Sequence, residues 1–224
     1  MKLFVKVLLS VVFSTLSLLA HADDFSDGVA LYEQQNFPAA AAAFRKAADQ
    51  GKSDAQFNLG LMYLKGEGVA QNYVEAKALF EKAASQNNVR AQVNLARMYA
   101  KAKGGAPNYG MAVYWFNKAV ELGYADAQYS LGVLYVSGIG VSRDYDKAHD
   151  LFLKAAQQKN ASAQYQLGLM YFKGKGVAID RVEAMKWFIL AGEYDDAVTY
   201  RRYAESQMNP KEVEEAKAEA AKAQ

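Results

Sequence analysis

The stretch AQFNLGLMYLKGEGV at residues 55–69 returns as AQYQLGLMYFKGKGV at residues 163–177, three steps of 36 residues further on. The two intermediate copies begin at Ala91 and Ala127, and the four copies align without a gap. A fixed period of about 20–50 residues is typical of a solenoid, in which each unit buries its apolar face only against its neighbours. The period therefore predicts a stack of similar units.

Each copy predicts two helices. In the first copy, apolar residues follow helical spacing along residues 55–65 and again along residues 73–85. Ala76 and Ala83 are small, which indicates that the two helices cross closely there. The same residue types return every 36 positions: Leu59, Leu95, Leu131 and Leu167; Tyr63, Tyr99, Tyr135 and Tyr171; Phe80, Phe116, Phe152 and Phe188. The fold class is therefore predicted to be an all-α solenoid of helix-turn-helix repeats.

The turns recur with the same period. Gly-x-Gly-Val at residues 66–69, 138–141 and 174–177 predicts a tight turn between the paired helices, because glycine adopts positive φ at little cost. Second helices are expected to start at the N-cap residues Asn72, Asn108, Asp144 and Asp180. Glu75 and Glu183 are expected to complete capping boxes.

Two places depart from the pattern. Gly51, Asn87 and Gly123 follow second helices, where a left-handed residue is favoured, but Lys159 breaks this series and Asn160 is expected to serve instead. In the second copy Ala96 replaces the glycine found at equivalent positions, and we interpret the loop at 102–107 as a drifted turn that uses Gly104 and Gly105.

The predicted domain organisation follows from these patterns. Residues 1–22 form a signal peptide, residues 23–52 an N-terminal helical cap with a short helix pair at 31–48, and residues 53–196 four repeats (53–88, 89–124, 125–160 and 161–196). Residues 197–224 form C-terminal capping helices. The last of these begins at Asn209-Pro210 and is expected to be a solvated helix with a weak apolar face.

The N-terminus resembles an export signal. Lys2 and Lys6 precede an apolar stretch from Val7 to Leu19, and Ala20-His21-Ala22 predicts cleavage before Asp23. The apolar stretch is shorter than the roughly 20 residues that span a bilayer, and no later stretch is long enough. We expect a periplasmic protein without a transmembrane segment, with secretion as the alternative. The absence of cysteine excludes disulfides and a lipid anchor.

Charge argues against a nucleic-acid partner. The chain has 26 basic and 24 acidic residues, so loss of Lys2 and Lys6 leaves 24 of each. A neutral chain has no overall attraction to polyanions.

The repeats 55–69 and 163–177, with the Ala and Phe positions that follow them, resemble Sel-one-like repeats (SLR) of the tetratricopeptide-repeat superfamily, in particular exported bacterial members. The resemblance covers residues 53 to about 191. It implies a right-handed α-solenoid whose concave face is lined by the first helix of each pair. It also implies an adaptor or binding scaffold that has no catalytic function.

The residues offer little chemistry beyond binding. The Gly-x-Gly loops lack the preceding strand and further glycine of a dinucleotide site. His149, at a position expected to be exposed, is the one histidine left after cleavage, and without cysteine it cannot build a zinc site in a monomer. We therefore predict no enzyme activity, no cofactor and no metal.

Binding is expected on variable positions of the first helices. By superfamily register these are Asn58, Leu61, Lys65, Asn94, Arg97, Lys101, Ser130, Val133, Ser137, Gln166, Leu169 and Lys173. Their spacing of three and four residues places each trio on one helix face. The four cations among them favour a protein or peptide partner with acidic or carboxylate groups. The alternative hypothesis is that the protein binds peptidoglycan or another glycan, and the third hypothesis is that it is a cell-wall hydrolase.

Overall fold

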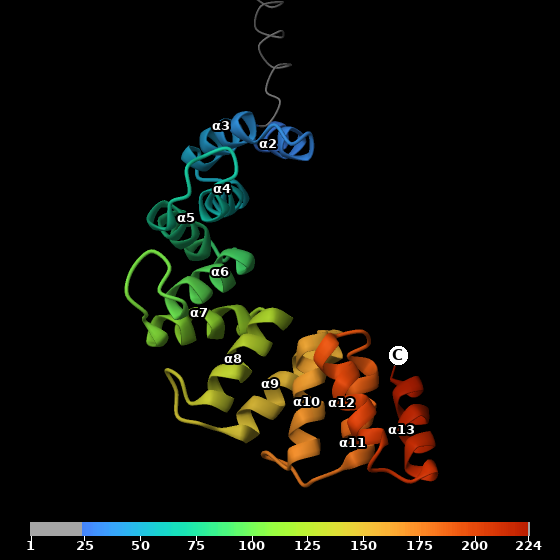
Figure 1. Ribbon diagram of the computed structural model, residues 1–224. Coiled ribbons are helices and arrows are strands. Elements are labelled where there is room, and N and C mark those ends of the chain that lie inside the picture. Colours follow the sequence, from blue (N-terminus) through green and yellow to red (C-terminus); the bar gives the residue numbers. More distant parts are fainter. Residues whose placement is uncertain (1–23, 224) are drawn as a thin grey trace, which may run out of the picture. The chain divides into compact units, whose positions relative to one another are not determined.

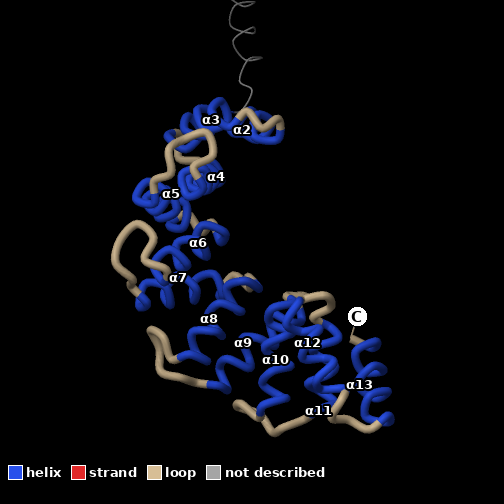
Figure 2. Tube along the Cα trace, in the orientation of Figure 1, coloured by secondary structure: helices blue, strands red, loops and turns tan. Residues whose placement is uncertain are grey.

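The computed structural model describes residues 24–223, which form twelve α-helices joined by turns and contain no strand (Figures 1 and 2). The all-α class and the helix-turn-helix repeats predicted from the sequence are confirmed. The predicted signal peptide, residues 1–22, lies outside the described residues. None of the helices described is long and apolar enough to cross a membrane.

The described residues divide into two compact units, 24–91 with 103–105, and 92–102 with 106–223. The first unit contains α2 (Asp24–Glu33), α3 (Phe37–Asp49), α4 (Ser53–Lys65) and α5 (Tyr73–Ser85). Helix α6 (Val89–Ala100) contributes residues to both units. The second unit contains α7 (Tyr109–Glu121), α8 (Ala125–Ser137), α9 (Tyr145–Gln157), α10 (Ala161–Lys173), α11 (Arg181–Leu190), α12 (Asp195–Glu205) and α13 (Pro210–Lys222).

A glycine on the first helix faces a phenylalanine ring of the second helix in several pairs. A Cβ added at Gly60 would lie 2.8 Å from the ring of Phe80, and one at Gly132 would lie 2.6 Å from the ring of Phe152. The two rings are fully buried. The glycine therefore sets how closely the two helices approach, and the alanines at 76 and 83, both fully buried, maintain that approach.

The two glycines of each Gly-x-Gly turn have different tasks. The first, for example Gly138 with φ +70°, is the left-handed C-cap of the first helix. The second lies against the start of the preceding repeat's second helix, where a Cβ on Gly140 would be 2.7 Å from the Cβ of Tyr109. The same contact recurs between Gly68 and Phe37, Gly104 and Tyr73, and Gly176 and Tyr145. The second glycine therefore joins one repeat to the next.

The second repeat keeps this turn. Gly104 has φ +80° like its equivalents, as predicted, and the missing first glycine is replaced by Ala102, which takes up the left-handed conformation with φ +57°. The position of the backbone is thus conserved between copies even where the residue that favours it is not.

Alanine substitutions separate the two glycine roles. Gly138→Ala should cost about 1 kcal/mol of unfolding free energy for the left-handed backbone alone, because its nearest neighbour is 3.5 Å away. Gly140→Ala should cost about 1–3 kcal/mol more, because the methyl group meets Tyr109. Urea denaturation measures both. Equal losses would show that the contact between repeats is unimportant.

The predicted N-caps are confirmed, but the predicted capping boxes are wrong. Asn72, Asn108, Asp144 and Asp180 each accept a hydrogen bond from a backbone N–H in the first turn of their helix. Their own backbone N–H groups donate to the carbonyls of Tyr63, Tyr99, Tyr135 and Tyr171, at 3.0–3.1 Å. Because the tyrosine carbonyl of the first helix already takes this donor, Glu75 and Glu183 have no capping role, and Glu183 pairs with Lys186 instead.

The prediction for Lys159 is also wrong. Lys159 itself adopts the left-handed conformation, with φ +61°, as Asn87 does with φ +62°. Asn160 has φ −71° and caps α10 by accepting a hydrogen bond from the N–H of Ala163. The geometry of the turn therefore imposes a left-handed residue even where the side chain does not favour one.

A glutamine is buried at the same position of every copy: Gln56, Gln92, Gln128 and Gln164. The side-chain amide of Gln56 donates to the carbonyl of Ala48, and its oxygen accepts a hydrogen bond from Gln86. In the third copy Gln158 donates to Gln128 and to the carbonyl of Gly123, both at 2.9 Å. In the first and third copies, these hydrogen bonds tie the end of the second helix to the first helix of the same copy, whereas the second copy has Leu122 at the position of Gln86 and Gln158.

Gln158→Leu should lower the free energy of unfolding by about 1–3 kcal/mol, because it leaves the buried oxygen of Gln128 without its donor. The neighbouring Gln157→Leu, at an exposed position of the same helix, is the matched control and should change stability little. Thermal or urea denaturation of the two variants measures their free energies of unfolding and tests this difference. If both variants lose the same stability, the glutamine bond contributes nothing specific.

The ends of the described chain differ from the predictions. The first helix begins at Asp24 rather than Leu31, and Gly28 lies against Phe44 as Gly60 lies against Phe80. The N-terminal pair is therefore a full repeat with a turn shortened by four residues. Helix α13 carries the predicted capping box of Asn209 and Glu212, but it is not simply solvated. It packs along α11, which Figure 1 shows beside it.

The contact of α13 depends on small residues. Val213, Ala216 and Ala220 are buried, and Met185 of α11 is only 1% exposed beneath them. Their spacing of three and four residues places them in a narrow stripe on one face of α13. The sequence predicts only a weak apolar face there, because alanine adds little hydrophobicity although it allows the helices to approach closely.

Ala216→Glu places a carboxylate against Met185 and should lower stability by more than about 2 kcal/mol. Ala218→Glu, at an exposed position two residues on, is its control and should be nearly neutral. Thermal unfolding followed by circular dichroism compares the stability of the two variants. A neutral Ala216→Glu would mean that α13 does not dock.

Candidate functional site

Eleven of the twelve residues predicted to bind a partner lie on α4, α6, α8 and α10, the first helices of their repeats, and Lys101 lies in the turn directly after α6. All twelve are half-buried or exposed, so none of them is a buried core residue. Several already have partners within the chain. The Ser130 hydroxyl donates to the carbonyl of Asp126, and the Ser137 hydroxyl donates to that of Val133, both at 2.7 Å. These hydroxyls are therefore less available to a ligand than the sequence suggests.

Two of the four predicted cations are paired with carboxylates. The Lys65 ammonium lies 3.4 Å from Glu67, and the Arg97 guanidinium lies 3.3 Å from Asp126 at the start of α8. Exposed pairs of this kind contribute at most about 1 kcal/mol, but they reduce the local charge. Lys101 is exposed, and Lys173 reaches the hydroxyl of Tyr200 at 3.4 Å. The surface is therefore less positive than the count of basic residues implies.

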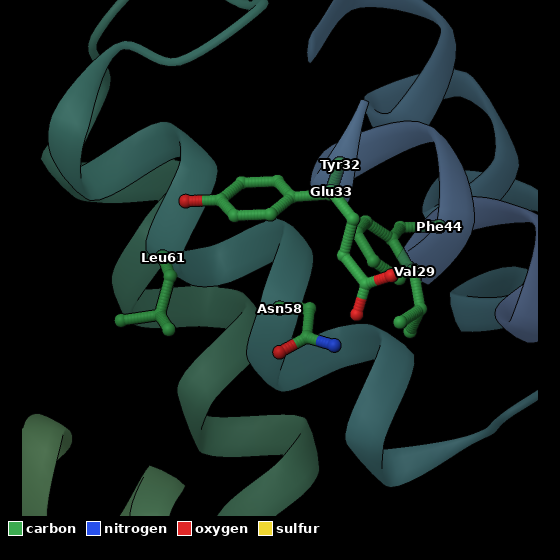
Figure 3. Close-up of a pocket in the computed structure, with 6 residues that line it drawn as sticks. All are labelled: Val29, Tyr32, Glu33, Phe44, Asn58 and Leu61. Carbon is green, nitrogen blue, oxygen red and sulfur yellow. The ribbon is translucent and has the colours of Figure 1, made fainter. Parts of the chain in front are cut away.

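In the first unit, a cavity of about 210 Å³ lies between α2 and α4. We call it the α2–α4 cavity, and it is lined by Val29, Tyr32, Glu33, Phe44, Asn58 and Leu61. Its surface is mainly apolar, with the Glu33 carboxylate and the Asn58 amide as its polar groups near one another (Figure 3). Asn58 and Leu61 were predicted to bind, whereas the residues of α2 and α3 were missed.

Tyr32, which lines this cavity, also forms a hydrogen bond with the turn after α4. The Tyr32 hydroxyl donates to Glu67 at 2.7 Å, and this bond raises the pKa of Tyr32 above its ordinary value. Glu67 also pairs with Lys65, so both side chains are held at the turn after α4.

In the second unit, a smaller cavity of about 60 Å³ lies at the corresponding place between α8 and α10. This α8–α10 cavity is lined by Val136, Tyr145, Gln166, Leu169, Met170, Lys173 and Lys175. Three of these residues, Gln166, Leu169 and Lys173, were predicted. Val136, Gln166 and Leu169 stand at the register of Tyr32, Asn58 and Leu61, so the two cavities share three positions of the repeat.

The two cavities differ in charge. Lys175, which lines the α8–α10 cavity, stands at the register of Glu67, and Val136 stands at the register of Tyr32, so the second unit has no counterpart of the hydrogen bond between Tyr32 and Glu67. Lys173 and Lys175 form no ion pair with any residue that the structure describes, and Lys175 lies 5.9 Å from the centre of the Tyr145 ring. Lys175 is the variable middle residue of a Gly-x-Gly turn. This variability could have indicated a binding residue, but we interpreted the turn as purely structural.

Groups for catalysis are not assembled. In residues 24–223, no cluster of three His, Cys, Asp or Glu side chains could hold a metal ion. His149 is not exposed as predicted: its side chain is 19% exposed and packs edge-on against the Tyr171 ring, 5.8 Å between centres. Burial raises the pKa of Tyr165 to about 12, so this hydroxyl stays protonated at neutral pH. We find no nucleophile paired with a base among these groups.

Comparison with known proteins agrees with this geometry. The Sel1 repeat family matches residues 28–52, 53–88, 89–124, 125–160 and 161–193. The chain belongs to the Sel1 repeat family. Membership indicates a protein–protein interaction scaffold, a class that is generally non-catalytic. No curated protein matches the chain.

Solved structures of the family are similar over most of the chain. The protective antigen c5321 of uropathogenic Escherichia coli, which has an SLR fold, is 34% identical over 89% of this chain with a TM-score of 0.83. This chain spans only 44% of c5321. A Sel1 repeat protein of Oxalobacter formigenes is 30% identical over 90% of this chain and 83% of its own, with a TM-score of 0.77.

Proposed function

We propose that the mature protein is a non-catalytic scaffold of the periplasm that holds an acidic peptide segment, or an envelope protein carrying one, against its first helices. The α8–α10 cavity is the observation that carries this proposal. It joins an apolar floor of Val136, Leu169 and Met170 to the amide of Gln166 and to two lysines. An extended or helical segment with one aliphatic side chain and a neighbouring carboxylate fits these groups.

The charges support an anionic partner at this place. Lys173 and Lys175 are exposed, and no carboxylate described in the structure neutralises them. The export to the periplasm rests on the basic start, the apolar stretch and the small residues before Asp23. A scaffold without a catalytic group needs only affinity and placement, which repeated helix pairs supply.

The proposal predicts a charge-dependent cross-link in living cells. A photoreactive residue at Ser137, which is exposed on α8 next to Val136, should yield a discrete protein adduct, and the cross-linked segment should be acidic by mass spectrometry. Lys173→Glu with Lys175→Glu should reduce the adduct at least tenfold by repelling that segment. Lys154→Glu, an exposed charge reversal on α9, should leave it unchanged.

A photoreactive residue at Lys154 is the control for position and should yield no such adduct. An adduct that survives the double reversal contradicts the acidic-segment proposal. Binding to isolated cell-wall sacculi in place of any protein adduct would favour the glycan alternative, and fractionation of the tagged protein tests the periplasmic location.

A further inference from the structure

The α2–α4 cavity has the opposite chemistry to the α8–α10 cavity. Its floor is formed by the apolar side chains of Val29, Phe44 and Leu61. The charged residue among those that line it is Glu33. Its volume of about 210 Å³ is below the roughly 300–1,000 Å³ of small-molecule sites. The size suits one side chain of a partner rather than a whole ligand.

Glu33 is the uncompensated charge of this region. Lys65 forms an ion pair with Glu67 at 3.4 Å, and the Tyr32 hydroxyl donates a hydrogen bond to Glu67 at 2.7 Å. These groups therefore interact with Glu67 rather than with Glu33. Among residues 24–223, no lysine or arginine lies within ion-pair distance of Glu33, which is exposed. Figure 3 shows the Glu33 carboxylate directed towards the side-chain amide of Asn58. The Asn58 amide has its nitrogen end on the side of this carboxylate, so one anionic acceptor, Glu33, borders an apolar hollow.

We propose that the α2–α4 cavity binds a lysine or arginine side chain of a partner protein. The methylene groups of such a side chain would lie along Val29, Phe44 and Leu61, while its cation would donate hydrogen bonds to the Glu33 carboxylate. Lysine and arginine are the side chains that combine a long apolar stem with a cationic end. The inference rests on the proposed function in one respect, that the partner is a protein.

The repeat itself argues that this preference is local. In the second unit Ser137, beside the α8–α10 cavity, stands at the register of Glu33, and Lys175, which lines that cavity, stands at the register of Glu67. The register of Glu33 therefore carries a hydroxyl group in the second unit, and the register of Glu67 carries an ammonium group. A cationic side chain is attracted to the first cavity and repelled from the second.

Selection of phage-displayed random dodecapeptides on the immobilised mature chain tests the inference. We expect a selected group with lysine or arginine at one fixed position. For a synthetic peptide of this group, Glu33→Gln should weaken binding at least tenfold, and so should norleucine in place of the fixed lysine. Combining the two changes should add little further loss, because both remove the same contact.

Glu75→Gln, which removes an exposed carboxylate of α5 away from the cavity, is the matched control and should leave binding unchanged. Circular dichroism confirms that both variants fold. No selected group with a fixed basic position, or binding that Glu33→Gln does not weaken, would overturn the inference. Selected peptides that are acidic and lost with Lys173→Glu and Lys175→Glu would uphold the proposed function while overturning this inference.

Discussion

The close approach of a glycine to its neighbour is the contact that sets the packing of the repeats, and Ala96 takes the place of the helix glycine in one of them. On the first helix, Gly60 and Gly132 lie against buried phenylalanine rings, where a Cβ would collide. In the turn, Gly140 lies against Tyr109 of the preceding repeat. The first contact fixes the helix pair, and the second fixes the step to the next pair. Because both use the absence of a side chain, they specify one packing distance and leave little freedom to vary it.

Hydrogen bonds secure the groups that this close packing removes from water. The buried glutamines reach the ends of neighbouring second helices, and the N-cap N–H groups reach tyrosine carbonyls of the first helices. A buried polar group without a partner costs about 1–3 kcal/mol, so these bonds make the register of each repeat specific rather than merely compact. The N-cap bond recurs in four repeats, which explains why the spacing between first and second helix is the same in those four.

Function is left to the positions that packing does not constrain. The first helices carry variable residues outward, and successive first helices enclose small cavities with apolar floors. The turn carries glutamate at position 67 and lysine at position 175, so the charge beside the two cavities differs in sign. One fold can therefore present sites of opposite preference without altering its core, as expected of a binding scaffold.

The sequence by itself determined the repeat, its helices, its N-caps and its turn glycines, because local backbone preference and apolar spacing act within a few residues of the chain. The tertiary structure alone decided which groups meet across repeats. It assigned the N-cap N–H groups to tyrosine carbonyls, left Lys159 in a left-handed turn and docked α13 on Met185. It also paired Lys65 and Arg97 with carboxylates and left Glu33, Lys173 and Lys175 to face cavities. These outcomes depend on distances through space between residues far apart in the chain, which periodicity does not encode.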